Sequence, residues 1–361
     1  MTDSGGPGAD ATGGADRFAA PVFWTGAAAL LLLAHSLAIS FPNDDAFISF
    51  RYATNWVHGH GLVFNPGERV EGYTNFLWTI VIGLLARLGA EPLLAARVLG
   101  FVASVGTLVL ATRLSGAMAP RWRRVRLAPL LLAASSPFAY WTLAGLETPL
   151  FTFLLLLAIE RELTWYRKGT GGSGGASFAV AVPLALLALT RPEGAPIFAL
   201  FVVARLAARL RAGRFLARDD VVLLVGFLAI YLPYFAWRLA YYGYFFPNTF
   251  YVRRGEGLAQ SVGLWRSGLR YAAGFFREGG GALLLAPLAI FGASGGRAGR
   301  GDRARARALA ALVAAWTVYV VWVGGDAKIL YRFFVPILPV VFLLVEAALS
   351  AVLGEDRKSV V

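Results

Sequence analysis

Residues 18–39 read FAAPVFWTGAAALLLLAHSLAI, and this apolar run decides the class of fold. It is long enough for a helix to cross the hydrocarbon core of a bilayer. The run is too long for the core of a signal peptide and no A-x-A cleavage motif follows it, so we interpret it as a retained transmembrane helix. The whole chain has 361 residues, of which 58% are hydrophobic. That fraction exceeds what soluble domains carry and indicates an all-α polytopic membrane protein.

Apolar and basic stretches alternate through the rest of the chain. Further apolar stretches follow at about 92–118, 127–142, 148–162, 177–191, 195–212, 220–241, 281–294, 307–324 and 333–353. The basic stretches between and after them are 121–126, 161–168, 205–218, 297–307 and 357–358. If every apolar stretch spans the bilayer, all basic stretches fall on one side, which the positive-inside rule assigns to the cytoplasm. The sequence therefore predicts about ten spans with both termini inside, and its net charge of +13 does not indicate nucleic-acid binding.

A single transmembrane module is expected over residues 18–353, between two cytoplasmic tails. The first tail, residues 1–17, has no apolar periodicity and is expected to be disordered, and the second is 354–361. On the outer side we expect a first loop at 41–75 and a later loop at 242–280. The chain has no Cys, which excludes disulfides, Cys-ligated zinc and thiol nucleophiles.

Residues 74–88 are the exception in the count of spans. The stretch is apolar but shorter than the roughly 17–25 residues that a spanning helix needs. Counting it as a span would place the basic stretch 121–126 outside and invert every later loop. We therefore predict an interfacial or re-entrant helix on the outer side. The glycine-rich stretch 169–175 is expected to be a flexible cytoplasmic linker.

The first outer loop holds two adjacent carboxylates that are unusual for a membrane protein. Residues 44–57 show a helical pattern in which Asp44, Arg51 and Asn55 share one stripe, opposite an apolar side. Such a helix would lie along the membrane surface and turn Asp44 and Arg51 toward a cavity. A carboxylate near a guanidinium suits a base that works beside a bound anion. The alternative is that Asp44 and Asp45 only cap the helix N-terminus.

The rest of the first outer loop and two short outer turns add further acids. Glu71 is either a solvated loop acid or a binding residue. Glu147 either caps the next helix or belongs to the site. Arg191 either pairs with Glu193 or faces a phosphate, and an arginine at the outer end of a helix runs against the positive-inside trend.

Later outer segments add aromatic and basic side chains. The aromatic run 241–251 is followed by Arg253, which could hold a lipid phosphate through bidentate bonds. Residues 258–277 have the pattern of a surface-lying amphipathic helix. In the last outer turn Asp326 precedes Arg332, so acid and base again meet at one membrane level.

At these residues the chain resembles the GT-C superfamily of integral membrane glycosyltransferases, and within it the AftB-like arabinofuranosyltransferase group. The resemblance runs through most of residues 18–353. The first string below, with its extended loop, is the most specific, and the shorter ones gain weight from their order. The strings are DDAFISFRY at 44–52, GLVFNPGERVEGYT at 61–74, GLETPLF at 145–151, TRPEG at 190–194, PNTFY at 247–251, and GGD at 324–326 followed by RF at 332–333.

The resemblance implies a polyprenyl-phosphate-linked sugar as donor and a cell-envelope glycan, lipid or protein as acceptor. It places the transfer on the extracytoplasmic face of a bacterial inner membrane. GT-C enzymes carry the catalytic base in the first outer loop, which maps onto Asp44 with Asp45 as its partner. The residues expected to bind substrate are Arg51, Asn55, Glu71, Tyr73, Glu147, Arg191, Glu193, Asn248, Arg253, Asp326 and Arg332.

Several features of this reaction are left open by the sequence. Longer members of the group carry a C-terminal extracytoplasmic domain, and this chain is expected to lack one, which leaves the acceptor and arabinose itself undecided. One base and a single displacement would invert the anomeric centre. Arginines can stabilise a phosphate leaving group without a metal, although a divalent cation held by Asp45 and other acids stays open. His58 and His60 make only a weak metal signal.

Two other functional classes fit the composition. A membrane transporter or flippase of lipid-linked saccharides would place ionisable groups near the bilayer midplane and show repeated halves, and neither feature is visible here. An O-antigen-type polymerase or ligase would share the outer-face carboxylates and arginines.

Overall fold

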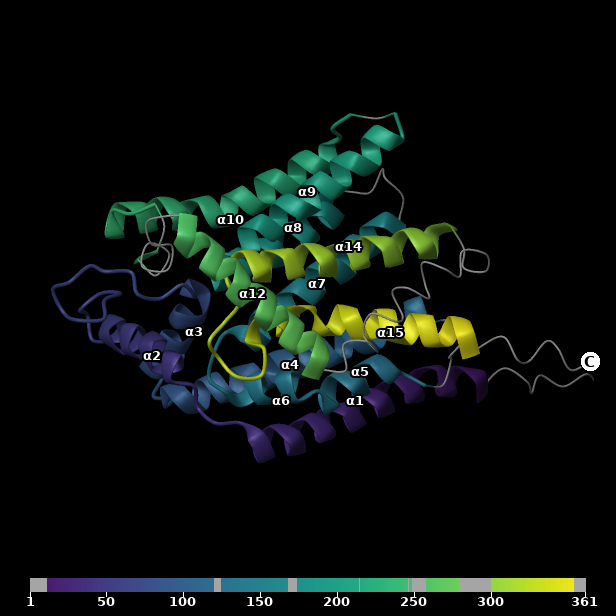
Figure 1. Cartoon of the computed structure of the whole chain (residues 1–361), viewed down its shortest axis with the longest axis horizontal. Helices are drawn as coiled ribbons and strands as arrows, with labels where there is room; N and C mark the ends of the chain where they lie inside the picture. The colour runs from purple at the N-terminus through teal and green to yellow at the C-terminus, as the bar shows by residue number, and fades with distance from the viewer. Residues whose placement is uncertain are drawn as a thin grey trace, which may run out of the picture.

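The computed structural model describes residues 12–119, 125–167, 174–213, 215–245, 247–248, 258–278 and 300–353. Within these residues the regular structure is helical, without a strand. The helices are α1 (Thr12–Ile39), α2 (Asp44–Val57), α3 (Phe76–Arg87), α4 (Pro92–Met118), α5 (Leu127–Ala134), α6 (Ser136–Leu143), α7 (Thr148–Arg167), α8 (Gly174–Thr190), α9 (Gly194–Arg211), α10 (Arg218–Tyr242), α12 (Leu258–Glu278), α14 (Arg300–Trp322), a 3-10 turn (Arg332–Ile337) and α15 (Leu338–Leu353). The expected all-α membrane fold is confirmed. The long helices run roughly side by side, with α2 and α3 at one end of the bundle (Figure 1).

Among the described residues, five helices are long and apolar enough to cross a membrane. They become six if α6 and α7, which meet at a bend of 117°, are counted as one broken span. The chain is thus a multi-pass membrane protein. The five are Ala20–Ile39, Pro92–Met118, Arg218–Tyr242, Arg305–Trp322 and Arg332–Ser350.

Some expected spans differ from the helices that form. The stretch 127–142 is not one span but the two short helices α5 and α6, because Pro137 has no amide hydrogen to continue α5 and its ring clashes with the carbonyl four residues earlier, so the chain becomes extended at Ser135. The stretch 281–294 lies outside the described residues, as do 1–11, 168–173 and 354–361 of the expected tails and linker. Helix α1 already begins at Thr12, inside the segment expected to be disordered.

Besides α2, two further helices that were expected not to span the membrane are present. Residues 74–88 contain α3, which has 12 residues and is too short to cross a bilayer. Residues 258–277 form α12, which packs against α14 where Gly268 lies against the backbone of Val321. Ala272 and Phe275 are buried on the same face as Gly268, whereas Arg266 and Arg270 on the opposite face are exposed. This distribution is that of an amphipathic helix with one face on the bundle.

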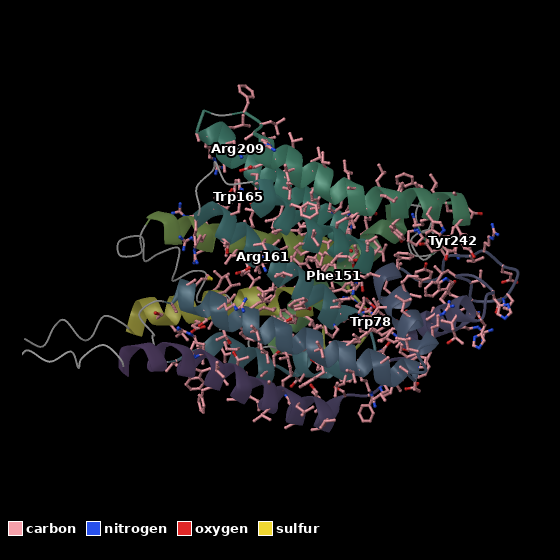
Figure 2. The ribbon with its side chains drawn as sticks, turned by 180° about the vertical axis from the view of Figure 1, so that it is seen from behind. Trp78, Phe151, Arg161, Trp165, Arg209 and Tyr242 are labelled. Atoms are coloured by element: carbon pink, nitrogen blue, oxygen red, sulfur yellow. The ribbon has the colours of Figure 1, made fainter. Side chains whose placement is uncertain are left out.

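Buried charges fasten the helices at the other end of the bundle. The basic stretch 205–218 is not only a connector, because Arg205 and Arg209 lie within α9 and are buried. Arg205 Nε donates to Glu162 at 2.8 Å on α7, and Arg209 Nε lies 2.5 Å from Asp220 on α10. The Arg205 guanidinium also lies 4.0 Å from the centroid of the Trp165 ring. Figure 2 places Trp165 and Arg209 at the end of the bundle opposite Tyr242.

Helix starts are set by capping groups, one of them distant in sequence. The Glu91 carboxylate accepts from the first amides of α4, including Leu93 N at 2.9 Å. Helix α5 is capped from α15 instead, since the fully buried Glu346 accepts from Leu127 N at 3.2 Å and Ala128 N at 3.0 Å. The capped start of α5 ties it to the last helix of the bundle.

Candidate active site

Two aspartates at the start of α2 meet a lysine from the turn before α15. Asn43 caps α2 by accepting from the Asp45 amide at 3.1 Å. The Lys328 Nζ donates to Asp44 Oδ1 at 2.6 Å and lies 3.2 Å from Asp45 Oδ1. Residues that are 284 positions apart in the sequence therefore form one cluster. The N-terminal capping alternative does not account for the lysine.

Arg332 adds a second cation beside the aspartates. Its Nε donates to Asp326 Oδ2 at 2.7 Å, and its Nη1 lies 3.9 Å from Asp45 Oδ2. Its guanidinium lies 5.6 Å from the centroid of the buried Trp141 ring. The Asp326 side chain is only 2% exposed, so Arg332 is held between a buried carboxylate and the Trp141 ring. The structure thus brings Asp44, Asp45, Asp326 and Arg332 together.

The turn that carries Lys328 has unusual backbone geometry. Gly324 and Gly325 both have positive φ, at 86° and 73°. Leu330 and Tyr331 also have positive φ, at 54° and 48°, which is uncommon for residues with a side chain. The Leu330 carbonyl accepts from Trp141 Nε1 at 3.2 Å, which helps to hold the strained backbone. Such strain is found where a structure must aim a side chain.

The lysine and the aspartates perturb one another. The hydrogen bond from Lys328, and then its charge, lower the pKa of Asp44 below its ordinary value. Burial opposes the charged form of Lys328, but its bonds with Asp44 and Asp45 outweigh burial and raise its pKa. The Asp44 side chain is 83% exposed and that of Lys328 is 22% exposed. At neutral pH Asp44 is therefore an accessible carboxylate that can accept a proton.

A second cluster lies buried where α6, α7, α8 and α9 meet. Arg191 Nη2 lies 2.7 Å from Glu193 Oε1, and its Nη1 lies 3.3 Å from Glu147 Oε1. The other Glu147 oxygen accepts from Asn75 Nδ2 at 2.8 Å. Of the two readings of Arg191, the pairing with Glu193 is the one observed. This guanidinium is enclosed by acids and by the Phe333 ring, 5.1 Å away, and so has little surface for a phosphate.

A third cluster joins the first outer loop to α10. Arg238 Nε donates to Glu71 Oε1 at 2.7 Å and its Nη2 donates to Oε2 at 2.6 Å. Beside this pair Tyr242 OH donates to the Leu62 carbonyl at 2.7 Å and lies 3.3 Å from Tyr73 OH, and both rings are buried. The Asn248 backbone N–H donates to the Glu71 backbone carbonyl at 3.2 Å, and Asn248 itself is exposed. Glu71 is thus not a solvated loop acid but the anchor of the loop.

Arg51 and Asn55 bind their own loop. Arg51 Nε donates to the Phe64 carbonyl at 2.7 Å, and Asn55 Nδ2 donates to the same carbonyl at 2.9 Å. Asp44 is bound instead by Lys328. The residues of the expected polar stripe therefore have different partners, because the loop folds back over the C-terminal half of α2 and not over its start.

Other expectations concern a metal and the later outer loop. Within the part of the chain that the structure describes, no group of three or more His, Asp or Glu side chains is placed to hold a metal ion. The His58 Nδ1 is 2.8 Å from the Thr54 carbonyl, which makes it a helix-end contact. Arg253 lies outside the described residues.

Three residues of these clusters were missing from the expected site. Lys328 is a cation in an outer turn, which the positive-inside trend marks as unusual. Arg238 is a charge near the end of an apolar span, and such residues usually have a partner or a function. Asn75, which links Glu147 to Ser49 of α2 through bonds of 2.8 Å and 3.0 Å, carries no sequence signal.

The sequence is similar to known sugar transferases. No family model matches it. It is 32% identical over 245 residues to a terminal beta-(1->2)-arabinofuranosyltransferase of Mycobacterium tuberculosis, covering 65% of this chain and 37% of that protein. It is 30% identical over 323 residues to the enzyme of the same name from Corynebacterium glutamicum, covering 79% of this chain and 44% of that protein. The chain thus spans less than half the length of these relatives, and the expected resemblance to the AftB-like group is confirmed.

A solved structure shares the arrangement of helices. The crystal structure of ArnT from Cupriavidus metallidurans bound to undecaprenyl phosphate matches 94% of this chain and 60% of the ArnT chain, with a TM-score of 0.54. The chain has the GT-C fold. Sequence identity to ArnT is 17%, so this likeness establishes the architecture, and the chemistry of this GT-C chain rests on its own residues. In this chain the cluster around Asp44 lies where the start of α2 faces the turn that precedes the 3-10 helix Arg332–Ile337.

Proposed function

We propose that this chain is a glycosyltransferase that moves a sugar from a polyprenyl-phosphate donor to a cell-envelope acceptor. The observation that carries the proposal is the exposed, ionised Asp44 with Lys328 and Arg332 beside it at one end of an apolar bundle. The names of the two relatives support sugar transfer and make arabinofuranose the first sugar to test. The lipid bound to ArnT supports a polyprenyl carrier.

The chemistry needs a base and a stabilised leaving group. Asp44 takes the proton of an acceptor hydroxyl as its oxygen attacks the anomeric carbon of the donor. A carbon–oxygen bond forms to the acceptor while the bond from the anomeric carbon to the phosphate oxygen breaks, and polyprenyl phosphate leaves with the electron pair. Lys328 and Arg332, beside Asp44 and Asp45, stabilise the negative charge on the leaving phosphate, which water would otherwise solvate. A single displacement of this kind inverts the anomeric centre.

We propose that Asp45 and Arg332 flank the sugar phosphate, since both belong to the cluster around Asp44. The other two clusters support this site without touching the reacting atoms. The Glu71–Arg238 pair fixes the outer loop, and Arg191 fixes the turns around Glu147 and Glu193. The basic connectors at the opposite end support a site on the extracytoplasmic face of the membrane.

The test compares purified wild type with Asp44→Asn. Each is given a panel of polyprenyl-phosphate sugars, with arabinofuranose included, and release of free polyprenyl phosphate is measured. We expect turnover to fall at least about 100-fold in Asp44→Asn, the usual contribution of a general base. Glu91→Gln is the control, because Glu91 is an exposed carboxylate at the start of α4 and should leave turnover intact.

The outcomes separate the alternatives. Full turnover in Asp44→Asn would assign the base elsewhere, with Asp45 next in line. If wild type released polyprenyl phosphate from no donor but moved lipid-linked sugar across vesicles, the protein would be a transporter and the proposal would be wrong.

A further inference from the structure

Lys328 is bound in a way that allows it to change partners. Its Nζ holds Asp44 at 2.6 Å and Asp45 at 3.2 Å, although the Asp44 side chain is 83% exposed. A lysine ammonium offers three donors on a flexible stem and can turn from one acceptor to another. Because water can solvate Asp44 as soon as the lysine leaves, the bond between them adds little stability.

Three arginines near this end of the bundle hold buried carboxylates, whereas Lys328 holds aspartates that water can reach. Each holds a carboxylate whose side chain is less than a tenth exposed. Removing a guanidinium from such a partner leaves a buried charge without compensation, which is costly. The pairs are Arg332 with Asp326, Arg191 with Glu193, and Arg238 with Glu71.

The backbone of Lys328 is held by a hydrogen bond to the buried Asp326, whereas its ammonium is held by the exposed Asp44 and the partly exposed Asp45. Its amide donates to Asp326 Oδ1 at 3.3 Å, and the Leu330 carbonyl accepts from Trp141. The ammonium can therefore swing about a stationary Cα atom. Exchange of its partner needs no movement of a helix.

The charges of the cluster require such an exchange when an anion enters. Among the residues that the structure describes, the carboxylates of Asp44, Asp45 and Asp326 face two cations, Lys328 and Arg332. A phosphate that enters beside Asp44 meets net negative charge unless a cation turns to it. We propose that Lys328 holds Asp44 and Asp45 in the empty site and turns to the donor phosphate when the lipid binds, which frees Asp44 to act as the base. This inference rests on the proposed function for the identity of the donor.

Binding of farnesyl phosphate, a short lipid phosphate, tests the exchange without catalysis. Affinity is measured on the full chain in detergent. We expect Lys328→Met to weaken binding at least about tenfold, and Lys328→Arg to restore most of it, because a charge-assisted bond to phosphate is lost and regained. Asp44→Asn should bind several-fold more tightly than wild type, since the acid no longer competes for the lysine. The control is Arg87→Met, which removes an exposed cation from α3 and should change nothing.

The pH dependence of turnover gives a second readout. Asp44 must be ionised to act, so activity disappears as pH falls through its pKa. Lys328 holds the pKa of Asp44 below its ordinary value in the empty site, so Lys328→Met should shift the acidic limb of kcat/KM, which reports the free enzyme, to higher pH. The acidic limb of kcat should stay in place, because the lysine has left Asp44 in the complex, whereas a lysine that stayed on Asp44 would make Lys328→Met shift both limbs.

Several results would overturn the inference. Equal affinity of wild type and Lys328→Met for farnesyl phosphate would show that the lysine does not bind phosphate, and unchanged or weaker binding by Asp44→Asn would exclude the exchange. If Lys328→Met also lost binding of the neutral farnesol, its role would be structural. Inorganic phosphate that bound as tightly as farnesyl phosphate would make this a free-anion site. Lysine-dependent binding without sugar transfer from any donor would instead defeat the proposed function and leave the lysine site standing.

Discussion

Replacing Arg238 by methionine is expected to release the first outer loop from α10. The Glu71 side chain is 4% exposed and receives three bonds of 2.6–2.9 Å from this guanidinium. Methionine fills much of the space but leaves the Glu71 carboxylate buried without a partner. Removing one member of a buried pair costs about 3–5 kcal/mol. Because the loop can open without unfolding the bundle, this energy should appear first as local opening.

Hydrogen exchange measures that opening directly. Each 1.4 kcal/mol is about tenfold in an equilibrium constant, so 3–5 kcal/mol predicts exchange about 100- to 4,000-fold faster for amides that the clamp protects. The Gly72 amide, which donates to the Tyr52 hydroxyl at 2.9 Å, is one of them. Mass spectrometry would follow peptides over 61–75, with peptides over α4 as the internal control.

A matched double variant separates charge from packing. Replacing both members by apolar residues, Glu71→Leu with Arg238→Met, removes the unpaired charge and should restore most of the protection. Unchanged exchange over 61–75 in the single variant would refute the reasoning. A double variant that exchanged faster than either single variant would show that the loop is held by packing and not by compensation of charge.

Two further predictions concern helix contacts. Gly268→Ala places a Cβ atom 2.2 Å from the Val321 carbonyl oxygen and should push α12 off α14, whereas Gly263→Ala on the same helix meets no atom within 4 Å and should be neutral or mildly stabilising. Thermal unfolding in detergent checks this, and equal melting temperatures of the two variants would contradict the packing. Glu346→Leu strands the first amides of α5 and the Ser115 hydroxyl, which donates to it at 2.7 Å, so we expect a loss of about 1–3 kcal/mol for each unsatisfied group. If Glu346→Leu had wild-type stability in unfolding titrations, the capping of α5 by Glu346 would be contradicted.

The sequence predicted the helical membrane fold and the start of the site because both depend on local patterns. Apolar runs such as 92–118 report spanning helices, and the charge of their connectors reports orientation. Asp44 and Asp45 stood out because carboxylates are unusual beside an apolar run. The short stretch 74–88 was separated from the spans by its length and by the charge of the connectors that follow it.

Partners of charged side chains could not be predicted in the same way. Arg51 lies two turns from Asp44 on one helical stripe, yet it binds the loop carbonyl of Phe64. The stretch 127–142 passes for one span by hydropathy, but Pro137 changes the direction of the chain within it.

By itself, the sequence determined that this chain is a multi-pass helical protein with carboxylates gathered in the connectors that do not carry the basic stretches. The spacing of apolar residues and the length of an apolar run are properties of one segment, so they can be recognised without the rest of the chain. Only the tertiary structure decided that Asp44 is bound by Lys328, and that Glu71 belongs to Arg238. An ion pair depends on which helices pack together, and distant residues acquire their partners only when the bundle closes.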